Sequence, residues 1–267
     1  MGTPLTTIVC MASENLESKV RRWLETTGFP LEMRVAREAR RAGPLWVDQS
    51  RPFVDPETGK LRETDVVVGM GPQNKQAGGY VFLVVECKAK PAPWIVFDDG
   101  DLPSDDADLR LARTPSRSPA DAYGDAKDVI VVSGAFTGNT LLKPSRMGFG
   151  VIEATFKDRP SERNAAWDAV RSAVSAAHGV IKEFSSQQIA SRAPALVAFP
   201  VVVTSGGLFR SFLDGDSIAV EKIDRGEVIV RTEATSEDVR CLVVSEDAWP
   251  SMLKDAQATT AVVGLGT

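Results

Sequence analysis

Hydrophobic and polar positions follow two different patterns along this chain, and each pattern predicts a different kind of element. Apolar residues recur every three or four positions over residues 13–27 and 161–184, which is the spacing of one face of an α-helix. Apolar runs within residues 62–69, 80–90 and 195–204 are typical of buried strands. Further extended segments are predicted at 29–37, 44–54, 147–156, 207–213, 217–223, 226–232 and 239–244, and a last helix at 246–256.

The order of these elements is helix, several strands, helix, strands, which predicts an α/β protein with a mixed central β-sheet flanked by helices. A chain of 267 residues, 43% of them hydrophobic, is long enough to bury one full core. We therefore expect a single domain over residues 1–267. Its core comprises residues 13–90 and 147–213, an irregular insertion rich in Pro, Asp, Ser and Arg lies at 91–128, and extra C-terminal strands lie at 207–267.

Composition narrows the kinds of site that the chain can hold. Its only histidine is His178, which argues against a Ser-His-Asp triad and against a multi-histidine zinc site. Three widely spaced cysteines, Cys10, Cys87 and Cys241, indicate a reducing compartment and no disulfide framework. No run of about 18 apolar residues is present, so we expect a cytoplasmic protein that does not span a membrane.

Charge is distributed unevenly along the chain. The formal net charge is −5, yet the segment from Lys19 to Arg41 contains seven basic residues and only three acidic ones. A basic cluster of this kind can contact a phosphate backbone. The candidates for nucleic-acid binding are Arg34, Arg37, Arg40, Arg41 and, later in the chain, Lys90. The six aspartates of residues 98–108 are interpreted as a solvated loop or as a contact for a basic partner.

The charged end of the strand predicted at 80–90 is the main candidate for chemistry. Side chains alternate across a strand, so Glu86 and Lys88 share one face while Cys87 lies on the other. We therefore interpret Cys87 as a small buried apolar residue. The simplest interpretation of Glu86 and Lys88 is an ion pair at the edge of a sheet, but the apolar residues before them favour a buried and functional position.

A second acidic position lies in the preceding strand, at Asp65. If the two strands are neighbours in a sheet, Asp65 can lie opposite Glu86. Two carboxylates at such close range repel each other unless a cation lies between them. Mg²⁺ prefers hard oxygen ligands of this type together with water. Lys88 could then position the attacking water and stabilise developing negative charge.

The sequence Asp65…Glu86-Cys87-Lys88, preceded by a helix and followed by a helix and strands, resembles the PD-(D/E)xK nuclease superfamily, also called restriction-endonuclease-like. The resemblance implies that fold, with Asp65 and Glu86 as metal ligands, Lys88 as a catalytic residue, and a glutamate from the helix before the sheet. Glu17 is the matching glutamate, because it borders the apolar stripe of its helix, whereas Glu14 points away. Asp65 follows Glu-Thr and not proline, so Glu63 is its rival.

The resemblance further implies hydrolysis of phosphodiester bonds with Mg²⁺, for which Mn²⁺ can substitute. The expected substrate is DNA in preference to RNA, and the expected enzyme is an endonuclease of a bacterial restriction or antiviral defence system. One alternative is an inactive module of the same fold that binds nucleic acid or a protein partner. Another is an unrelated protein in which Glu-Cys-Lys is coincidental. The intact acidic and basic residues favour the nuclease, and both a homodimer and a protein partner remain open.

Overall fold

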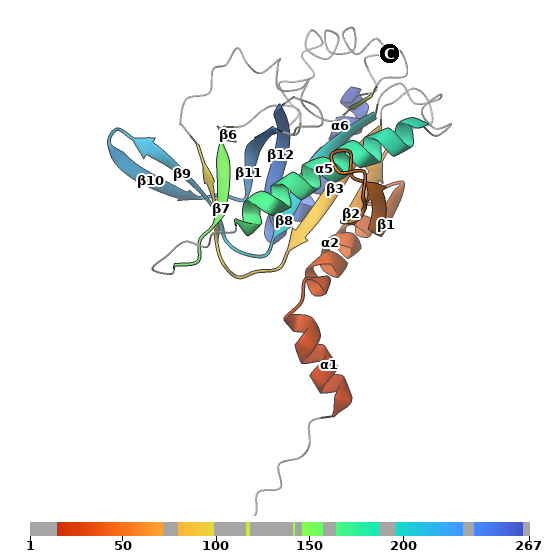
Figure 1. Ribbon diagram of the computed structural model, residues 1–267, viewed down its shortest axis with the longest axis horizontal. Helices are drawn as coiled ribbons and strands as arrows, with labels where there is room; N and C mark the ends of the chain where they lie inside the picture. The colour runs from red at the N-terminus through yellow and green to blue at the C-terminus, as the bar shows by residue number, and fades with distance from the viewer. Residues whose placement is uncertain are drawn as a thin grey trace, which may run out of the picture.

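A computed structural model describes residues 15–71, 80–98, 116–117, 141, 146–156, 164–186, 196–231 and 238–263. These residues form two β-sheets with helices packed against them (Figure 1). The larger sheet is mixed and is flanked by helices, so the α/β class expected from the sequence is confirmed.

The larger sheet has eight strands, with β1, β2, β3, β8, β12, β11 and β6 in spatial order and the short β5 paired to β8. Strands β1, β2 and β3 are antiparallel neighbours, whereas β8 runs parallel to both β3 and β12. Every residue of β8 is buried, as its apolar sequence predicts. The strands are β1 (Trp46–Val54), β2 (Leu61–Met70), β3 (Tyr80–Lys88), β5 (Ser116–Arg117), β6 (Met147–Gly148), β8 (Leu196–Thr204), β11 (Arg225–Arg231) and β12 (Asp238–Ser245).

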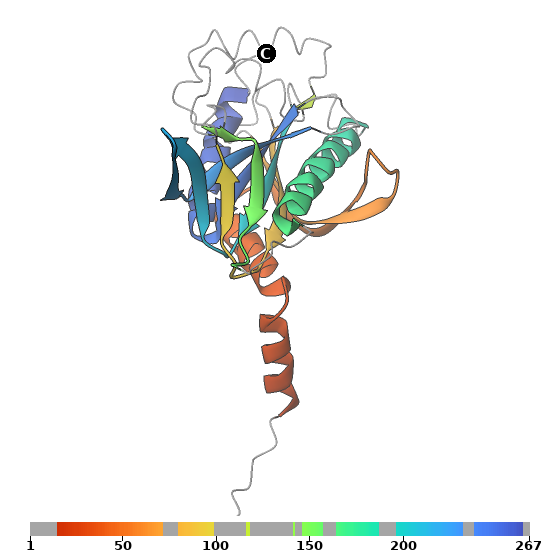
Figure 2. The same ribbon diagram turned by 60° about the vertical axis from the view of Figure 1, so that its left-hand side comes forward.

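Helices cover both faces of this sheet (Figure 2). The long helix α5 (Ala165–Ser186) packs on one face, where its alanines and valines meet alternate residues of β2, β3 and β8. Helices α2 (Phe29–Arg41) and α6 (Trp249–Val263) pack on the opposite face, and the short η2 (Glu246–Ala248) precedes α6. Since the central strands are buried on both sides, only the strand ends can carry charged groups at low cost.

A smaller sheet lies beside the first, with the strands β10, β9, β4 and β7 in spatial order. Its inner face packs against the first half of α5 and against β11 and β12. Strands β4 and β5 fall within the segment 91–128 that the sequence predicted to be irregular, so that prediction is wrong for residues 94–97 and 116–117. Most of the remainder of 91–128 lies outside the described residues. The strands are β4 (Trp94–Phe97), β7 (Gly150–Glu153), β9 (Leu208–Asp214) and β10 (Ser217–Lys222).

The segment 29–37, which we predicted to be extended, is helical. Pro30 stands in the first turn of α2, where its fixed φ favours a helix and its missing N–H is not needed. Leu31, Val35 and Ala39 then fall on one buried stripe against the sheet and α6. The helical period becomes clear only when the segment is followed to Ala39, because two of the four buried positions are alanines that carry little hydrophobic signal.

Helix α1 (Leu16–Glu25), predicted at 13–27, forms but does not pack as its apolar stripe suggested. It has no buried residue, and it projects away from the two sheets (Figures 1 and 2). Asn15 caps its first turn by accepting a hydrogen bond from the Ser18 backbone N–H. In the part of the chain that the structure describes, no helix combines the length and the apolar character needed to cross a bilayer.

Candidate functional site

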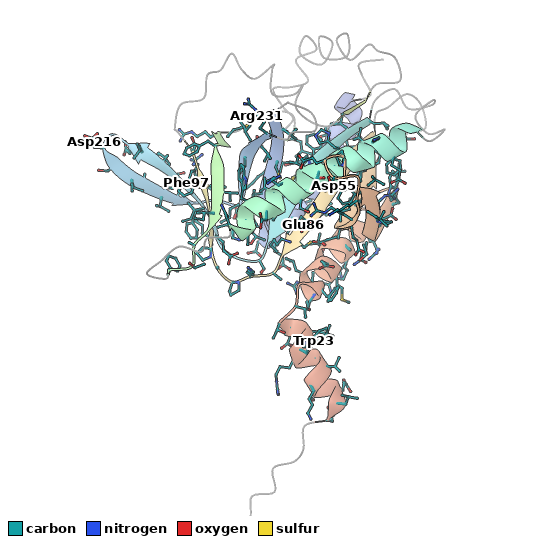
Figure 3. The ribbon with its side chains drawn as sticks, in the orientation of Figure 1. Trp23, Asp55, Glu86, Phe97, Asp216 and Arg231 are labelled. Atoms are coloured by element: carbon teal, nitrogen blue, oxygen red, sulfur yellow. The ribbon has the colours of Figure 1, made fainter. Side chains whose placement is uncertain are left out.

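Strands β2 and β3 pair directly, as we predicted, and their register brings the two acidic positions together. Val66 pairs with Val85 in this antiparallel ladder, so the next step of the register places Asp65 opposite Glu86. Opposed residues of an antiparallel pair lie on the same face of the sheet. Here that face is the one covered by α5, since Ser172 of α5 donates a hydrogen bond to Glu86 Oε2 at 3.4 Å. Figure 3 shows Glu86 at the end of β3 that lies beside the start of α5.

Lys88 and Glu86 form a close ion pair at this strand end. The distance from Lys88 Nζ to Glu86 Oε1 is 2.5 Å. Both side chains are largely shielded, with 30% of Lys88 and 12% of Glu86 exposed. Burial acts to lower the pKa of Lys88, but the charge and hydrogen bond of Glu86, together with the charge of Asp65, raise it overall. The ammonium therefore remains charged beside the carboxylates, which suits an electrostatic role better than that of a proton acceptor.

Asp65 is held beside Glu86 by a hydrogen bond to the backbone of β3. The backbone N–H of Cys87 donates to Asp65 Oδ2 at 2.6 Å. Burial and the charge of Glu86 nevertheless raise the pKa of Asp65 to about 7, and the Cys87 hydrogen bond only partly offsets them. Burial is the larger cause of the raised pKa and the negative charge of Glu86 the second, and the positive charge of Lys88 offsets them only in part.

Cys87 itself is part of the core and not of the chemistry. Its side chain is 5% exposed and belongs to the cluster beneath α2 and α6. Burial, reinforced by the charge of Asp65, raises the pKa of the Cys87 thiol well above its ordinary value. The expectation of a small buried apolar residue is thus confirmed.

The helix glutamate that interacts electrostatically with this site is Glu32, whereas Glu17 does not lie near it. Burial, followed by the charge of Glu86, raises the pKa of Glu32, while Lys88 acts in the opposite direction. Glu17 instead lies on the projecting α1, where its side chain is 79% exposed and pairs with Arg21 at 3.2 Å. Glu32 stands in the first turn of α2, beside the buried Leu31, and the wrong prediction for 29–37 concealed it. Glu14 lies outside the described residues.

Glu63, the rival of Asp65, occupies the same strand two residues earlier. Its position is exposed, whereas that of Asp65 is partly buried. It contributes to the raised pKa of Glu32, so it lies at the rim of the acidic group. Asp65, directly opposite Glu86, is the better placed of the two.

The loop after β8 supports the end of β3 where Lys88 lies. Lys88 pairs with Thr204 across the parallel ladder, and its carbonyl accepts a hydrogen bond from Ser205 N–H at 3.2 Å. Gly206 lies very close to the segment that follows β3. A Cβ added to it would be 2.3 Å from the Ala92 carbonyl oxygen. Only glycine permits this approach, which fixes the backbone around Lys88.

Strand β1 is distorted next to Asp65. Gln49 pairs with Val66 and Arg51 with Thr64, so the intervening Ser50 lies across from Asp65 by register. Ser50 has a φ of 52°, in the left-handed region that non-glycine residues rarely occupy. Backbone strain of this kind is often found at functional sites.

The basic candidates on α2 are engaged in ion pairs and hydrogen bonds with neighbouring side chains. Arg34 binds Glu246 of η2 through two hydrogen bonds, of 2.5 and 3.0 Å. Arg37 and Arg41 both contact Glu38, and Arg40 donates to Gln49 at 2.8 Å. Lys90 follows the site on the chain, is 54% exposed, and lies 3.4 Å from Glu153. Their contact with nucleic acid stays a prediction.

The donors present suit a hard cation better than a soft one. Asp65 and Glu86, with Glu32 nearby, offer carboxylate oxygens only, and Mg²⁺ is commonly held by one or two carboxylates plus waters. Within the described ranges, no three residues of the types His, Cys, Asp and Glu are arranged to hold a metal ion by themselves. The binding of Mg²⁺ here stays a prediction, and it would require water or substrate oxygens as further ligands.

Comparisons of the chain with models of protein families, with curated proteins and with solved structures found no match.

Proposed function

We propose that this protein is a Mg²⁺-dependent nuclease with a restriction-endonuclease-like fold, in which Asp65, Glu86 and Lys88 form the active centre. The mixed sheet between α2 and α5, with these residues at the paired ends of β2 and β3, supports the proposal. DNA is the proposed substrate and endonucleolytic cleavage, in restriction or antiviral defence, the proposed activity. The proposed compartment is the cytoplasm, in keeping with the two free buried cysteines Cys87 and Cys241.

The crowding of Asp65 against Glu86 is the single observation that carries this proposal. A purely structural ion pair would need only one carboxylate, Glu86, beside Lys88. A second carboxylate, Asp65, lies opposite Glu86, and the pKa of Asp65 is raised to about 7. Such an excess of acid at a partly buried strand end costs stability unless a cation binds there. The arrangement therefore favours a metal site over a fortuitous cluster of charges.

Each residue of the proposed active centre would have a distinct role in phosphodiester hydrolysis. Asp65 and Glu86 would hold Mg²⁺, which supplies Lewis-acid activation of the phosphate and of a bound water. Lys88, fixed by Glu86, stands where an ammonium can orient the attacking water and stabilise charge developing on the phosphate oxygens. Ser172 orients Glu86 from α5, and Glu32 on α2 interacts with Glu86 and Lys88 through its charge.

Cleavage of plasmid DNA with Mg²⁺ tests this function, using wild type, Glu86→Gln and Glu153→Gln. Glu153 is a matched control, because it is also shielded, at 13% exposure, and also pairs with a lysine, Lys90. We expect Glu86→Gln to abolish cleavage while Glu153→Gln retains it. We also expect Mg²⁺ or Mn²⁺ to raise the melting temperature of the wild type and not that of Glu86→Gln.

A module of the same fold that binds nucleic acid without cleaving it is the second candidate. It would show the metal-dependent rise in melting temperature and DNA binding, with no cleavage by the wild type. The paired Lys88 favours the enzyme, because a site used only for binding does not need an ammonium beside its metal ligands. Absence of both cleavage and a metal-dependent thermal shift would overturn both candidates.

A further inference from the structure

The hairpin of β9 and β10 projects from the smaller sheet and leaves one strand edge open. Within the described residues, β10 pairs with β9 only, and it is the last strand of its sheet. Three aliphatic side chains on one face of this hairpin face solvent: Leu213 is 65% exposed, Ile218 is 76% exposed and Val220 is 58% exposed. Figure 3 shows Asp216 at the tip of the hairpin, far from the site around Glu86.

An open apolar strand edge is normally protected against pairing with another chain. The outer strand of the larger sheet, β1, is protected in this way, because it contains Pro52 and is distorted at Ser50, which has a φ of 52°. Strand β10 has neither device over its sequence SIAVEK. Its charged residues, Glu221 and Lys222, lie at one end, so the centre of the edge exposes large aliphatic residues and is suited to a strand from another chain.

The hairpin register shows which backbone groups of β10 are free to pair. Asp214 and Ser217 flank a two-residue turn, so they exchange both hydrogen bonds of the first pair. The same pattern directs the backbone groups of Ala219 toward Phe212, its partner in β9. The N–H and C=O groups of Ile218, Val220 and Lys222 therefore point to the open side.

We propose that this edge pairs with β10 of a second copy of the chain, antiparallel and about a two-fold axis through Ala219. In this register Ile218 lies opposite the partner's Val220, so the two exposed aliphatic residues form a cross-strand pair in each direction. Asp216, in the turn just before β10, then lies next to the end of the partner's strand at Lys222, which brings opposite charges together at both ends of the pairing. The remaining pair, Ser217 opposite the partner's Glu221, joins a polar residue to a charged one and brings no like charges together.

Other registers fit less well. A shift of one residue would place the exposed aliphatic face of one hairpin on the opposite side of the joined sheet from that of the other. A shift of two residues in one direction would place Val220 opposite the partner's Val220 but Ile218 opposite the partner's Lys222. The opposite shift would place Ile218 opposite the partner's Ile218 but Val220 opposite the partner's Asp216. Either shift keeps one aliphatic pair where the proposed register has two, and the charge pair is lost. The apolar centre and the opposite charges at its two ends thus match a reversed copy of the same strand.

Sedimentation over micromolar concentrations tests the pairing with Val220→Pro. Proline at this position removes an N–H that points outward, and edge strands tolerate proline there, so the β9 ladder is preserved. We expect a concentration-dependent dimer for the wild type and a monomer for Val220→Pro, with the melting temperature of dilute protein little changed. Trp23→Ser is the control, since it alters the other exposed apolar surface, on α1, where Trp23 is 60% exposed.

A wild type that stays monomeric at all concentrations would overturn the proposal, and so would a dimer that survives Val220→Pro. Loss of the dimer in Trp23→Ser alone would assign the interface to α1 instead. A charge exchange tests the register: Lys222→Asp should weaken the dimer, and the double variant Asp216→Lys/Lys222→Asp should restore it. Failure of the double variant to restore the dimer would overturn this register.

Oxidation of Ala219→Cys tests the register directly. Ala219 would face its own copy in a non-hydrogen-bonded pair, with Cα atoms about 4.5 Å apart, within the range of a disulfide. The matched variant Ser217→Cys would lie about 13 Å from its own copy by the rise of a strand. We expect an oxidised dimer for Ala219→Cys and none for Ser217→Cys, and equal cross-linking of the two would contradict the proposal. DNA cleavage plays no part in these measurements, so they succeed or fail independently of the proposed function.

Discussion

The carboxylate of Asp65 accepts a hydrogen bond of 2.6 Å from the backbone N–H of Cys87, across two strands and 22 positions of sequence. This bond holds Asp65 against the segment Glu86-Cys87-Lys88 even though Glu86 repels it. The hydrogen bonds between β2 and β3 therefore hold Asp65 and Glu86 close together although their negative charges repel. Several consequences of this conflict can be measured.

The charge on Asp65 should make the metal-free protein less stable at alkaline pH. Its pKa in the folded state is about 7, above the ordinary 3.8, so the folded state binds the proton more tightly than the unfolded state does. The free energy of unfolding should then fall as the pH rises from about 4 to about 7, and stay low above that. In EDTA at pH 8.5, Asp65→Asn should be the more stable protein, by no more than about 4 kcal/mol.

Asp55→Asn is a control for which the pH dependence of stability should have the opposite sign. Burial alone would raise the pKa of Asp55, but hydrogen bonds from Arg62 and from the backbone lower it below 3.8. This carboxylate stabilises the fold above its unfolded pKa, and the stabilisation is lost as the pH falls. Urea unfolding of both variants at pH 4 and pH 8.5 would show opposite trends, and parallel trends would contradict the assignment.

Glu32 and Glu17 should differ sharply in their effect on cleavage. Glu32→Gln removes a carboxylate that interacts with Glu86 and Lys88, so we expect DNA cleavage to slow by about 10–100-fold. Glu17→Gln removes a carboxylate that is 79% exposed and paired only with its helix neighbour Arg21, so cleavage should be unchanged. Initial rates at saturating Mg²⁺ distinguish the two, and a loss confined to Glu17→Gln would show that α1 closes on the site during catalysis.

Lys88→Ala should slow the chemical step while leaving DNA affinity intact. The ammonium lies 2.5 Å from Glu86 Oε1, and loss of one electrostatic donor costs roughly a hundredfold or more in rate. Lys88→Arg should rescue poorly, since a planar guanidinium cannot occupy the position of a compact ammonium. Single-turnover cleavage and a binding titration at fixed salt separate rate from affinity. A change in affinity alone would make Lys88 a phosphate contact.

Gly206→Ala should disturb the site through the backbone. The new Cβ would lie 2.3 Å from the Ala92 carbonyl oxygen and 2.9 Å from that of Lys90, and neither backbone atom can yield without moving the end of β3. We expect a loss of about 1–3 kcal/mol in the free energy of unfolding. Gly150→Ala is the control, because its Cβ would meet only Phe97, at an ordinary 3.9 Å. Equal melting temperatures for the two variants would contradict this account.

The sequence by itself determined the central strands β2, β3 and β8 and the pairing of the acidic residues. The apolar runs that became β2, β3 and β8 are too hydrophobic to lie anywhere but in a buried sheet. Strand alternation then placed Glu86 and Lys88 on one face and Cys87 on the other. Adjacent strands in an antiparallel sheet usually follow one another in the chain, so Asp65 and Glu86 could be expected to meet.

Tertiary structure alone decided which helix completes the site. The apolar stripe of α1 resembled a buried helix face and drew attention to Glu17, yet α1 packs against neither sheet, while the weaker pattern of α2 is buried under α6. The separation of β4, β7, β9 and β10 into a second sheet was likewise not visible, because each of these strands is short. Periodicity reports that a face is apolar, but which surface covers it depends on contacts between residues far apart in sequence, and those contacts brought Glu32 within electrostatic range of Glu86.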